Sequence, residues 1–428
     1  MSFKRNLISN VIFQIINIII AFCTSVIAAR ALGPELRGQS AYFMLIITTI
    51  CEFVDLGINN SVIYFLKKSR YDSSEVLGTN LIFLIANSVF IGALLLFLRI
   101  LGVALSNYSI FVCIVGATSV IFASLKGMGS ELYIAREEVY KLNKSLLAFK
   151  LIKILVFAIL YIGGRFNIMS YLITMNFITI IEGATIFLSI KNSYEFSLKI
   201  NFQFFRVEIK YAIKMILAHL FIYLNYKMDQ VLIKVMLDDY QLGLYSVAVY
   251  LAEILFLVPT CINSALIGKV SNMKTDFKDV IIKTIKVTFN LSIILSLVGC
   301  LCTALVPMVY GSEYAAIKIT IVILFAGIIF ASIGKVAYTY FTMNNKPEVH
   351  MYISVMTLII NIIGNFVLIP LLGINGAAIA STISYTLFGV IYLVILNRKE
   401  YVKYADMLFI TSKDFKDMKA TLKKIVSE

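Results

Sequence analysis

Positively charged side chains occur deep inside apolar stretches of this sequence. Lys153, Lys227 and Lys335 stand far from the ends of their stretches, and Lys150 shares a helical face with Lys153. A charged side chain at the centre of a bilayer costs roughly 2.5–3.5 kcal/mol on insertion scales, so such residues usually face a cavity or a partner. Ammonium groups in a cavity suit phosphoryl oxygens. We therefore predict that these four lysines, together with Arg30, bind an anionic substrate.

Acidic residues in the same stretches form a second candidate set. Glu52 and Asp55 are three residues apart and share a helical face, while Asp229 and Glu253 stand alone. A carboxyl group removed from water responds to protons or cations, so we predict that these four residues take part in ion coupling. The alternative is that they are static partners of the lysines, a structural role favoured for Asp55 and Asp229.

Other kinds of site chemistry are missing from the pattern. The six cysteines lie in apolar runs without CxxC or His/Cys ligand spacing, which predicts neither disulfides nor a metal site. No loop carries the acidic or histidine cluster that a membrane-embedded transferase would need. The chain is therefore predicted not to be an enzyme and to hold no cofactor.

The elements that carry these charges are apolar segments long enough to cross a membrane. Hydrophobic residues make up 60% of the 428 positions and charged residues 14%, against about 45–50% and about 25% in soluble domains. A spanning helix needs about 20 apolar residues, and helices satisfy their own backbone groups in lipid. The sequence predicts an all-α integral membrane protein with twelve transmembrane helices, near 6–31, 39–66, 77–101, 106–126, 140–162, 166–190, 209–236, 243–268, 281–310, 316–343, 349–370 and 375–396.

Loop charges predict the orientation of these helices. The formal net charge is +14, and Lys and Arg concentrate in alternate loops, whereas the opposite loops hold only Arg37, Arg99, Arg165 and Lys318. By the positive-inside rule both termini are cytoplasmic in a multi-pass protein. The basic residues separate hydrophobic segments and form no aromatic-interleaved patch, so nucleic acid is excluded as a partner.

A weak internal repeat divides the chain into halves. The turn at 32–38 resembles that at 237–243, and six predicted helices separate them. This predicts two parallel six-helix bundles, residues 1–200 and 201–396, related by an axis along the membrane normal. Residues 397–428 form a basic tail, predicted either as an amphipathic helix on the anionic inner leaflet or as a solvated frayed helix.

Short segments along the chain resemble the polysaccharide-transport, or Wzx-type, flippases of the superfamily that includes multidrug and toxin extruders and the lipid II flippase. The segments are Ala29-Arg30-Ala31-Leu32-Gly33-Pro34, Asp55-Leu56-Gly57, Met228-Asp229-Gln230, Gly243-Leu244-Tyr245-Ser246, Tyr310-Gly311-Ser312-Glu313-Tyr314, Leu368-Ile369-Pro370 and Gly373-Ile374-Asn375-Gly376-Ala377-Ala378. They follow one another in the family's order across nearly the whole chain.

The resemblance implies a MATE-like fold, with the two bundles around a central cavity that opens alternately to each side of a bacterial plasma membrane. The implied cargo is an undecaprenyl-diphosphate-linked oligosaccharide of O-antigen, capsule or a related polysaccharide. Membrane lipid and a polysaccharide polymerase are the expected partners. Coupling to a proton gradient, a sodium gradient or the membrane potential stays open. The alternative is a multidrug or toxin cation antiporter with the same fold.

Overall fold

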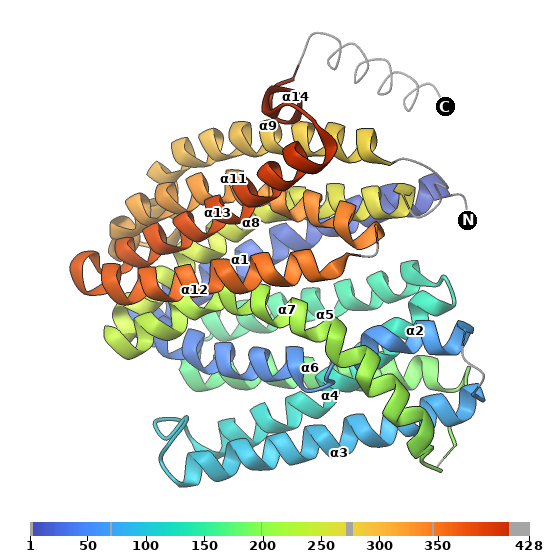
Figure 1. The fold of residues 1–428 in the computed structure, drawn as a ribbon. Coiled ribbons are helices and arrows are strands. Elements are labelled where there is room, and N and C mark those ends of the chain that lie inside the picture. The colour runs from blue at the N-terminus through green and yellow to red at the C-terminus, as the bar shows by residue number, and fades with distance from the viewer. Residues whose placement is uncertain (1–2, 69–70, 198, 271–276, 345, 411–428) are drawn as a thin grey trace. The chain divides into compact units, whose positions relative to one another are not determined.

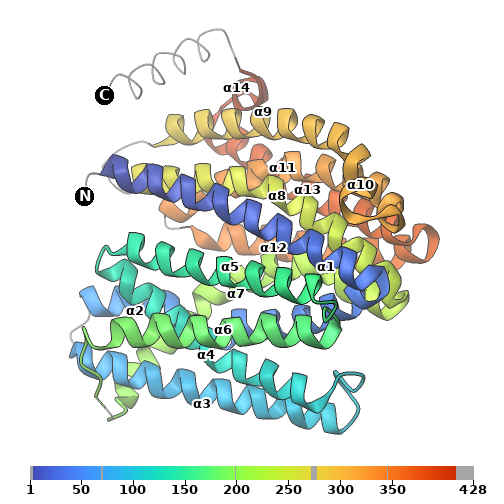
Figure 2. The ribbon, with the colours of Figure 1, turned by 180° about the vertical axis from the view of Figure 1, so that it is seen from behind.

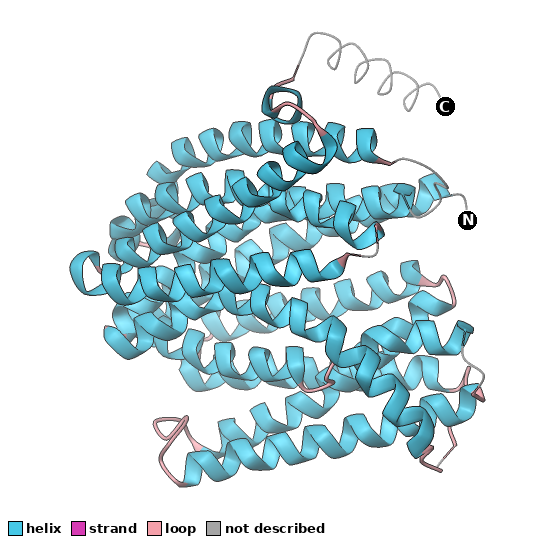
Figure 3. Ribbon diagram, in the orientation of Figure 1, coloured by secondary structure: helices cyan, strands magenta, loops and turns pink. Residues whose placement is uncertain are grey.

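The computed structural model describes residues 3–68, 71–197, 199–270, 277–344 and 346–410 (Figure 1). Within these ranges the regular structure is helical, with no strand (Figure 3). The helices are α1 (Phe3–Phe53), α2 (Ile58–Lys68), α3 (Ser73–Ile100), α4 (Ile110–Ala135), α5 (Val139–Ile162), α6 (Ile168–Lys191), α7 (Phe202–Met236), α8 (Asp239–Val270), α9 (Lys278–Cys302), α10 (Val306–Tyr310), α11 (Ile317–Met343), α12 (Pro347–Leu372), α13 (Ile374–Glu400) and α14 (Tyr404–Leu408). The 3-10 turns η1 (Thr303–Leu305) and η2 (Ser312–Ala316) flank α10.

Ten candidate spans in the described residues are long and apolar enough to cross a membrane. They cover α1 from Phe13, most of α8, the α9–α10 and η2–α11 stretches, and α3, α4, α5, α6, α12 and α13. The predicted all-α integral membrane fold is therefore confirmed. The count of twelve stays a prediction, because two predicted spans lie within α1 and α2, and α7 is not among the ten.

The first two predicted helices are not separated by a loop. α1 runs through the first and into the second, and its only residue with non-helical φ and ψ is Gly33, with φ 67° and ψ 172°. A left-handed φ is readily adopted by glycine, and the following Pro34 has no N–H to donate to the preceding turn. The expected turn at 32–38 is therefore a kink within one continuous element.

A second interruption divides what the sequence predicted as helix 39–66. α1 ends at Phe53 and α2 starts at Ile58, and between them Leu56 and Gly57 have φ values of 49° and 82°. The Asp55 Oδ1 accepts a hydrogen bond from the Gly57 N–H at 2.9 Å. Asp55 therefore stabilises the break itself.

The chain forms two compact units, Met1–Leu220 and Phe221–Glu428. In the first unit α4 packs against α3 and α6, and α1 packs against α5 (Figure 2). In the second, α11 packs against α8, α9 and α13, and α12 packs against α13. The predicted domain limits at residues 200 and 396 remain predictions. Of the predicted tail, residues 411–428 lie outside the described residues, whereas Met407 on α14 is buried against α9.

A tight helix contact recurs in both units. A Cβ atom added to Gly183 of α6 would lie 2.0 Å from the Phe122 carbonyl oxygen of α4. A Cβ added to Gly389 of α13 would lie 2.1 Å from the Phe330 carbonyl oxygen of α11. Small residues let helices approach this closely in lipid. α4–α6 and α11–α13 are the fourth and sixth predicted helices of their halves, so the packing follows the proposed repeat.

Candidate functional site

Three lysines and one glutamate form a charged cluster in the first unit. The Lys126 Nζ on α4 lies 3.3 Å from the Glu182 Oε2 on α6. Lys150 and Lys153 on α5 interact electrostatically with both of these residues. We call these four residues the α4–α6 cluster. The cluster holds three basic residues and one acidic residue, an excess of positive charge that suits a bound anion.

Lys126 is the member of the α4–α6 cluster that the sequence reading assigned to a loop. The sequence predicts that helix 106–126 ends at this residue. Instead α4 continues to Ala135, and the Gly129 Cβ position lies 3.0 Å from Ile186 of α6. Gly129 is a contact point between helices, so Lys126 is held inside a predicted span beside Glu182.

The other predicted site residues of the first unit, Arg30, Asp55 and Glu52, each have different surroundings. Arg30 is exposed on α1, and Asp55 caps the break before α2. The Glu52 Oε2 lies 3.7 Å from the His219 Nε2 of α7, a contact that is ionic only when the histidine is protonated. Glu52 therefore lies beside the His219 side chain of α7.

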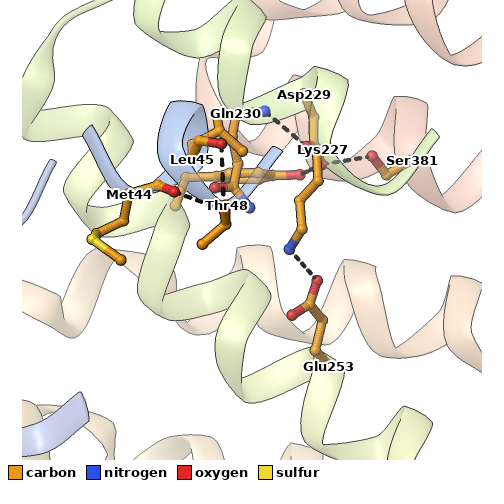
Figure 4. Close-up of polar contacts among 9 residues, drawn as sticks. Met44, Leu45, Thr48, Lys227, Asp229, Gln230, Glu253 and Ser381 are labelled. Carbon is orange, nitrogen blue, oxygen red and sulfur yellow. Dashed lines mark hydrogen bonds and ion pairs between the residues drawn. The ribbon is translucent and has the colours of Figure 1, made fainter. Parts of the chain in front are cut away.

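In the second unit a predicted cation and a predicted carboxylate form an ion pair. The Lys227 Nζ of α7 lies 2.9 Å from the Glu253 Oε1 of α8, and Figure 4 shows the two side chains pointing toward each other. The Lys227 side chain is 26% exposed and that of Glu253 is 40% exposed. Each charge largely neutralises the other, so neither acts here as an isolated cavity charge.

Lys335 of α11 rests on aromatic rings. Its Nζ lies 4.1 Å from the Phe256 ring centroid and 5.7 Å from that of Tyr226. The Thr260 Oγ1 accepts a hydrogen bond from the same amine at 3.4 Å, and Glu253 also acts on it electrostatically. Cation–π attraction of this kind holds an ammonium group without cancelling its charge.

Asp229 of α7 is buried, with 1% of its surface exposed, and is surrounded by donors. Its Oδ2 accepts from the Tyr245 hydroxyl at 2.6 Å and from the Ser381 Oγ at 3.1 Å, and its Oδ1 accepts from the Gln230 N–H at 2.7 Å (Figure 4). These bonds join α7 to α8 and α13. Bonds between helices fit the structural role that the sequence favours for Asp229, and its part in ion coupling stays a prediction.

Buried amides of the second unit bridge helices. The Ser384 Oγ donates to the Asn225 Oδ1 at 2.8 Å, and the Asn361 Nδ2 donates to the Ser381 Oγ at 3.2 Å. The Thr339 Oγ1 donates to the Asn263 Oδ1 at 2.8 Å. Interhelical hydrogen bonds of this kind are common in membrane proteins, and they orient these amides toward protein.

The described residues contain no cluster of metal-ligating side chains. Across residues 3–68, 71–197, 199–270, 277–344 and 346–410, no group of three or more His, Cys, Asp or Glu side chains could hold a metal ion. The six cysteines are free thiols.

Comparisons with known proteins identify both a family and a fold. Residues 3–274 match the family described as "Polysaccharide biosynthesis protein". The capsular polysaccharide biosynthesis protein CapF of Staphylococcus aureus is 25% identical over 386 residues, which are 86% of this chain and 93% of that protein.

Solved structures share the fold at low identity. The lipid II flippase MurJ in an inward closed conformation superposes with a TM-score of 0.78 at 14% identity, covering 91% of this chain and 88% of MurJ. An inward-facing multidrug resistance transporter of the MATE family superposes with a TM-score of 0.70 at 9% identity, covering 89% and 93%. The predicted MATE-like architecture is therefore confirmed.

Proposed function

The chain belongs to the polysaccharide biosynthesis protein family, and from that premise we propose that it is a flippase for an undecaprenyl-diphosphate-linked oligosaccharide. The cargo is an O-antigen, capsule or related repeat unit. Transport runs by alternating access from the cytoplasmic to the outer face of a bacterial plasma membrane, with both termini cytoplasmic. The lipid carrier stays in the membrane, and a polysaccharide polymerase is the expected receiver of the product.

The observation that carries the proposal is the α4–α6 cluster. A pyrophosphate linker presents negative charge to the bilayer, and a hydrophobic surrounding strengthens its attraction to ammonium groups. Lys126, Lys150 and Lys153 provide that charge within predicted spans, with only partial neutralisation by Glu182. The cluster therefore recognises the part of the cargo that all lipid-linked repeat units share, whichever sugars follow.

The membrane potential can drive such a transfer without a bound cofactor. Moving one charge through 100 mV is worth about 2.3 kcal/mol, so outward movement of two negative charges from a negative interior gains about 4.6 kcal/mol. Proton or sodium coupling through Glu52 or Glu253 remains a further element of the proposal, as does a direct role of Arg30.

The test replaces the cluster lysines one at a time. K126Q, K150Q and K153Q are expressed in a strain lacking this protein, and lipid-linked intermediates are measured on each face of the membrane. We expect each variant to accumulate intermediates on the inner face at normal protein levels. K144Q is the matched control, because Lys144 lies exposed on the same helix as Lys150. Normal export in all three cluster variants would contradict the proposal.

A cation antiporter of the same fold is the second candidate, favoured by the MATE-like superposition. Its cargo would be a hydrophobic cation, which the net positive α4–α6 cluster repels. Efflux of a fluorescent lipophilic cation by the purified protein in proteoliposomes, lost in E253Q, would support the antiporter in place of the flippase.

A further inference from the structure

A fully buried carboxyl group lies at the start of α7, outside the sites described above. Glu208 is 0% exposed. Its Oε1 accepts hydrogen bonds from the Ser61 Oγ of α2 at 2.7 Å and from the Asn80 Nδ2 of α3 at 3.0 Å. All three residues belong to the first unit. Glu208 thus joins the beginning of α7 to two other helices through one carboxyl oxygen.

Two buried oxygens beside this junction have no hydrogen-bond partner. They are the Oε2 of Glu208 and the Oδ1 of Asn80. A carboxylate oxygen and an amide oxygen are both acceptors, so they cannot bond to each other. A single proton on the Glu208 Oε2 turns that oxygen into a donor, and the amide that already donates to Oε1 offers its own oxygen as the acceptor. One proton would thereby give both oxygens a partner, as in a paired acid and amide.

Among the side chains that the structure describes, the charged groups near Glu208 do not supply a cation for a carboxylate. Arg206 and Lys210 are exposed and stand two residues away on α7, toward the other side of the helix. On α3, the Glu75 Oε2 accepts from the Asn201 Nδ2 at 2.8 Å, and Asp72 caps the helix. On α2, Tyr64 is exposed and stacks on Tyr211 of α7.

The balance between the two protonation states follows from burial. Glu208 precedes the stretch of α7 that was predicted to span from residue 209. Burial raises the pKa of its carboxyl group to about 7, and the hydrogen bonds from Ser61 and Asn80 lower that pKa only in part. The proton is therefore exchangeable near neutral pH.

The segment before α7 is fixed to the same helix α3. The Ser197 N–H donates to the Ser74 carbonyl oxygen at 2.9 Å, and the Asn201 N–H donates to the Thr79 Oγ1 at 3.0 Å. A Cβ on Gly78 would lie 1.7 Å from the Ser197 carbonyl oxygen, so the two backbones touch. The first turns of α7 are therefore docked in the first unit, and the same helix continues past residue 220 into the second.

We infer that Glu208 is a proton-binding site, in which the neutral carboxylic acid pairs with the Asn80 carboxamide and fastens the start of α7 to α2 and α3. Release of the proton to solvent breaks the O–H bond and leaves a carboxylate beside an unpaired amide oxygen. The start of α7 is then held less firmly. This site does not depend on the nature of the cargo.

The sign of the pH effect follows from proton linkage. A carboxyl group whose folded pKa is raised contributes stability that is fully present below its unfolded pKa, about 4.3, and is lost as the pH rises through about 7. The purified full chain in detergent should therefore show a falling thermal midpoint across this interval. E208Q should keep the stability of the neutral form and flatten that part of the profile, because the glutamine amide donates as the acid does.

Two further variants separate pairing from a generic loss of packing. N80D places a second carboxyl group against Glu208 and should destabilise the protein as the pH rises. The exchanged pair N80D/E208Q restores one acid and one amide and should recover the midpoint. E195Q is the matched control, since Glu195 is exposed, and should leave the profile unchanged.

An infrared measurement tests the proton directly, even if a variant folds poorly. The difference spectrum of the wild type between mildly acidic and alkaline pH should contain a protonated-carboxyl C=O band that is missing from the same difference spectrum of E208Q. Identical pH profiles of the wild type and E208Q, or no recovery in the exchanged pair, would overturn the inference. Glycan export enters none of these readouts, so their outcome is independent of the proposed cargo.

Discussion

The two units repeat a backbone contact but not the charges beside it. Gly183 lets α6 touch the carbonyl of Phe122, and Gly389 lets α13 touch that of Phe330. In the first unit Lys126 pairs with Glu182 while Lys150 and Lys153 add further positive charge to the cluster, whereas in the second Lys227 and Glu253 pair one to one. A duplicated helix packing has therefore diverged in electrostatics. The charges of the first unit are suited to binding an anion, whereas those of the second unit neutralise each other in an internal ion pair.

The largest effect is expected from substitutions that disrupt the helix packing shared by the two units. Leucine at Gly183 or at Gly389 would push a side chain into a backbone carbonyl, and overpacking of this kind destabilises by roughly 1–3 kcal/mol or more. We expect both variants to lose folded protein to a similar degree, measured by yield and thermal midpoint in detergent. T185L, at an exposed position of α6, is the control. A loss in only one of the two variants would mean that the contacts are not equivalent.

The next effect separates the two charge arrangements. In the second unit, K227Q and E253Q should each destabilise by about 1–2 kcal/mol, less than the roughly 3–5 kcal/mol of fully buried pairs because both side chains are partly exposed. The double variant should recover much of that loss. In the first unit E182Q should destabilise more than K126Q, because it leaves three lysines to repel one another. Equal effects of E182Q and K126Q on the thermal midpoint would remove the proposed difference.

The smallest effect concerns Lys335 and its aromatic support. F256L should weaken the cation–π contact by about 0.5–2 kcal/mol. A double-mutant cycle of K335M and F256L, read by chemical unfolding, isolates that pair from the general loss of packing. A coupling energy indistinguishable from zero would show that the Phe256 ring contributes hydrophobic packing and no cation–π attraction.

The sequence was sufficient for the features that depend on local pattern. Apolar length predicted the membrane helices, and depth within those stretches singled out Lys150, Lys153, Lys227 and Lys335. All four lie inside helices, as expected. The number of residues between a charged side chain and the end of its apolar stretch indicates how deep that side chain lies in the lipid. Deep charges need a partner, and they can be found in this way without knowledge of the fold.

The partners themselves depend on contacts between distant helices, which a pattern does not contain. The sequence offers several acids as possible partners of the lysines, and only the approach of α7 to α8 shows that Glu253 pairs with Lys227. Gly127, next to Lys126, is a packing position in the fold, because a Cβ atom there would meet the Asn59 side chain. Glu208 stands one residue before the predicted helix 209–236, and only the fold shows that its side chain is buried.

The break at Asp55 has a consequence for the tightness of the membrane seal. The N–H groups of Val54, Leu56 and Ile58 each donate to a carbonyl three or four residues earlier, and that of Gly57 donates to the Asp55 side chain. An interrupted helix in lipid would otherwise have to recruit water to these donors. Because these N–H groups already have partners within the chain, the helix can bend here without ordered water inside the membrane, and such water would provide a path for ion leakage.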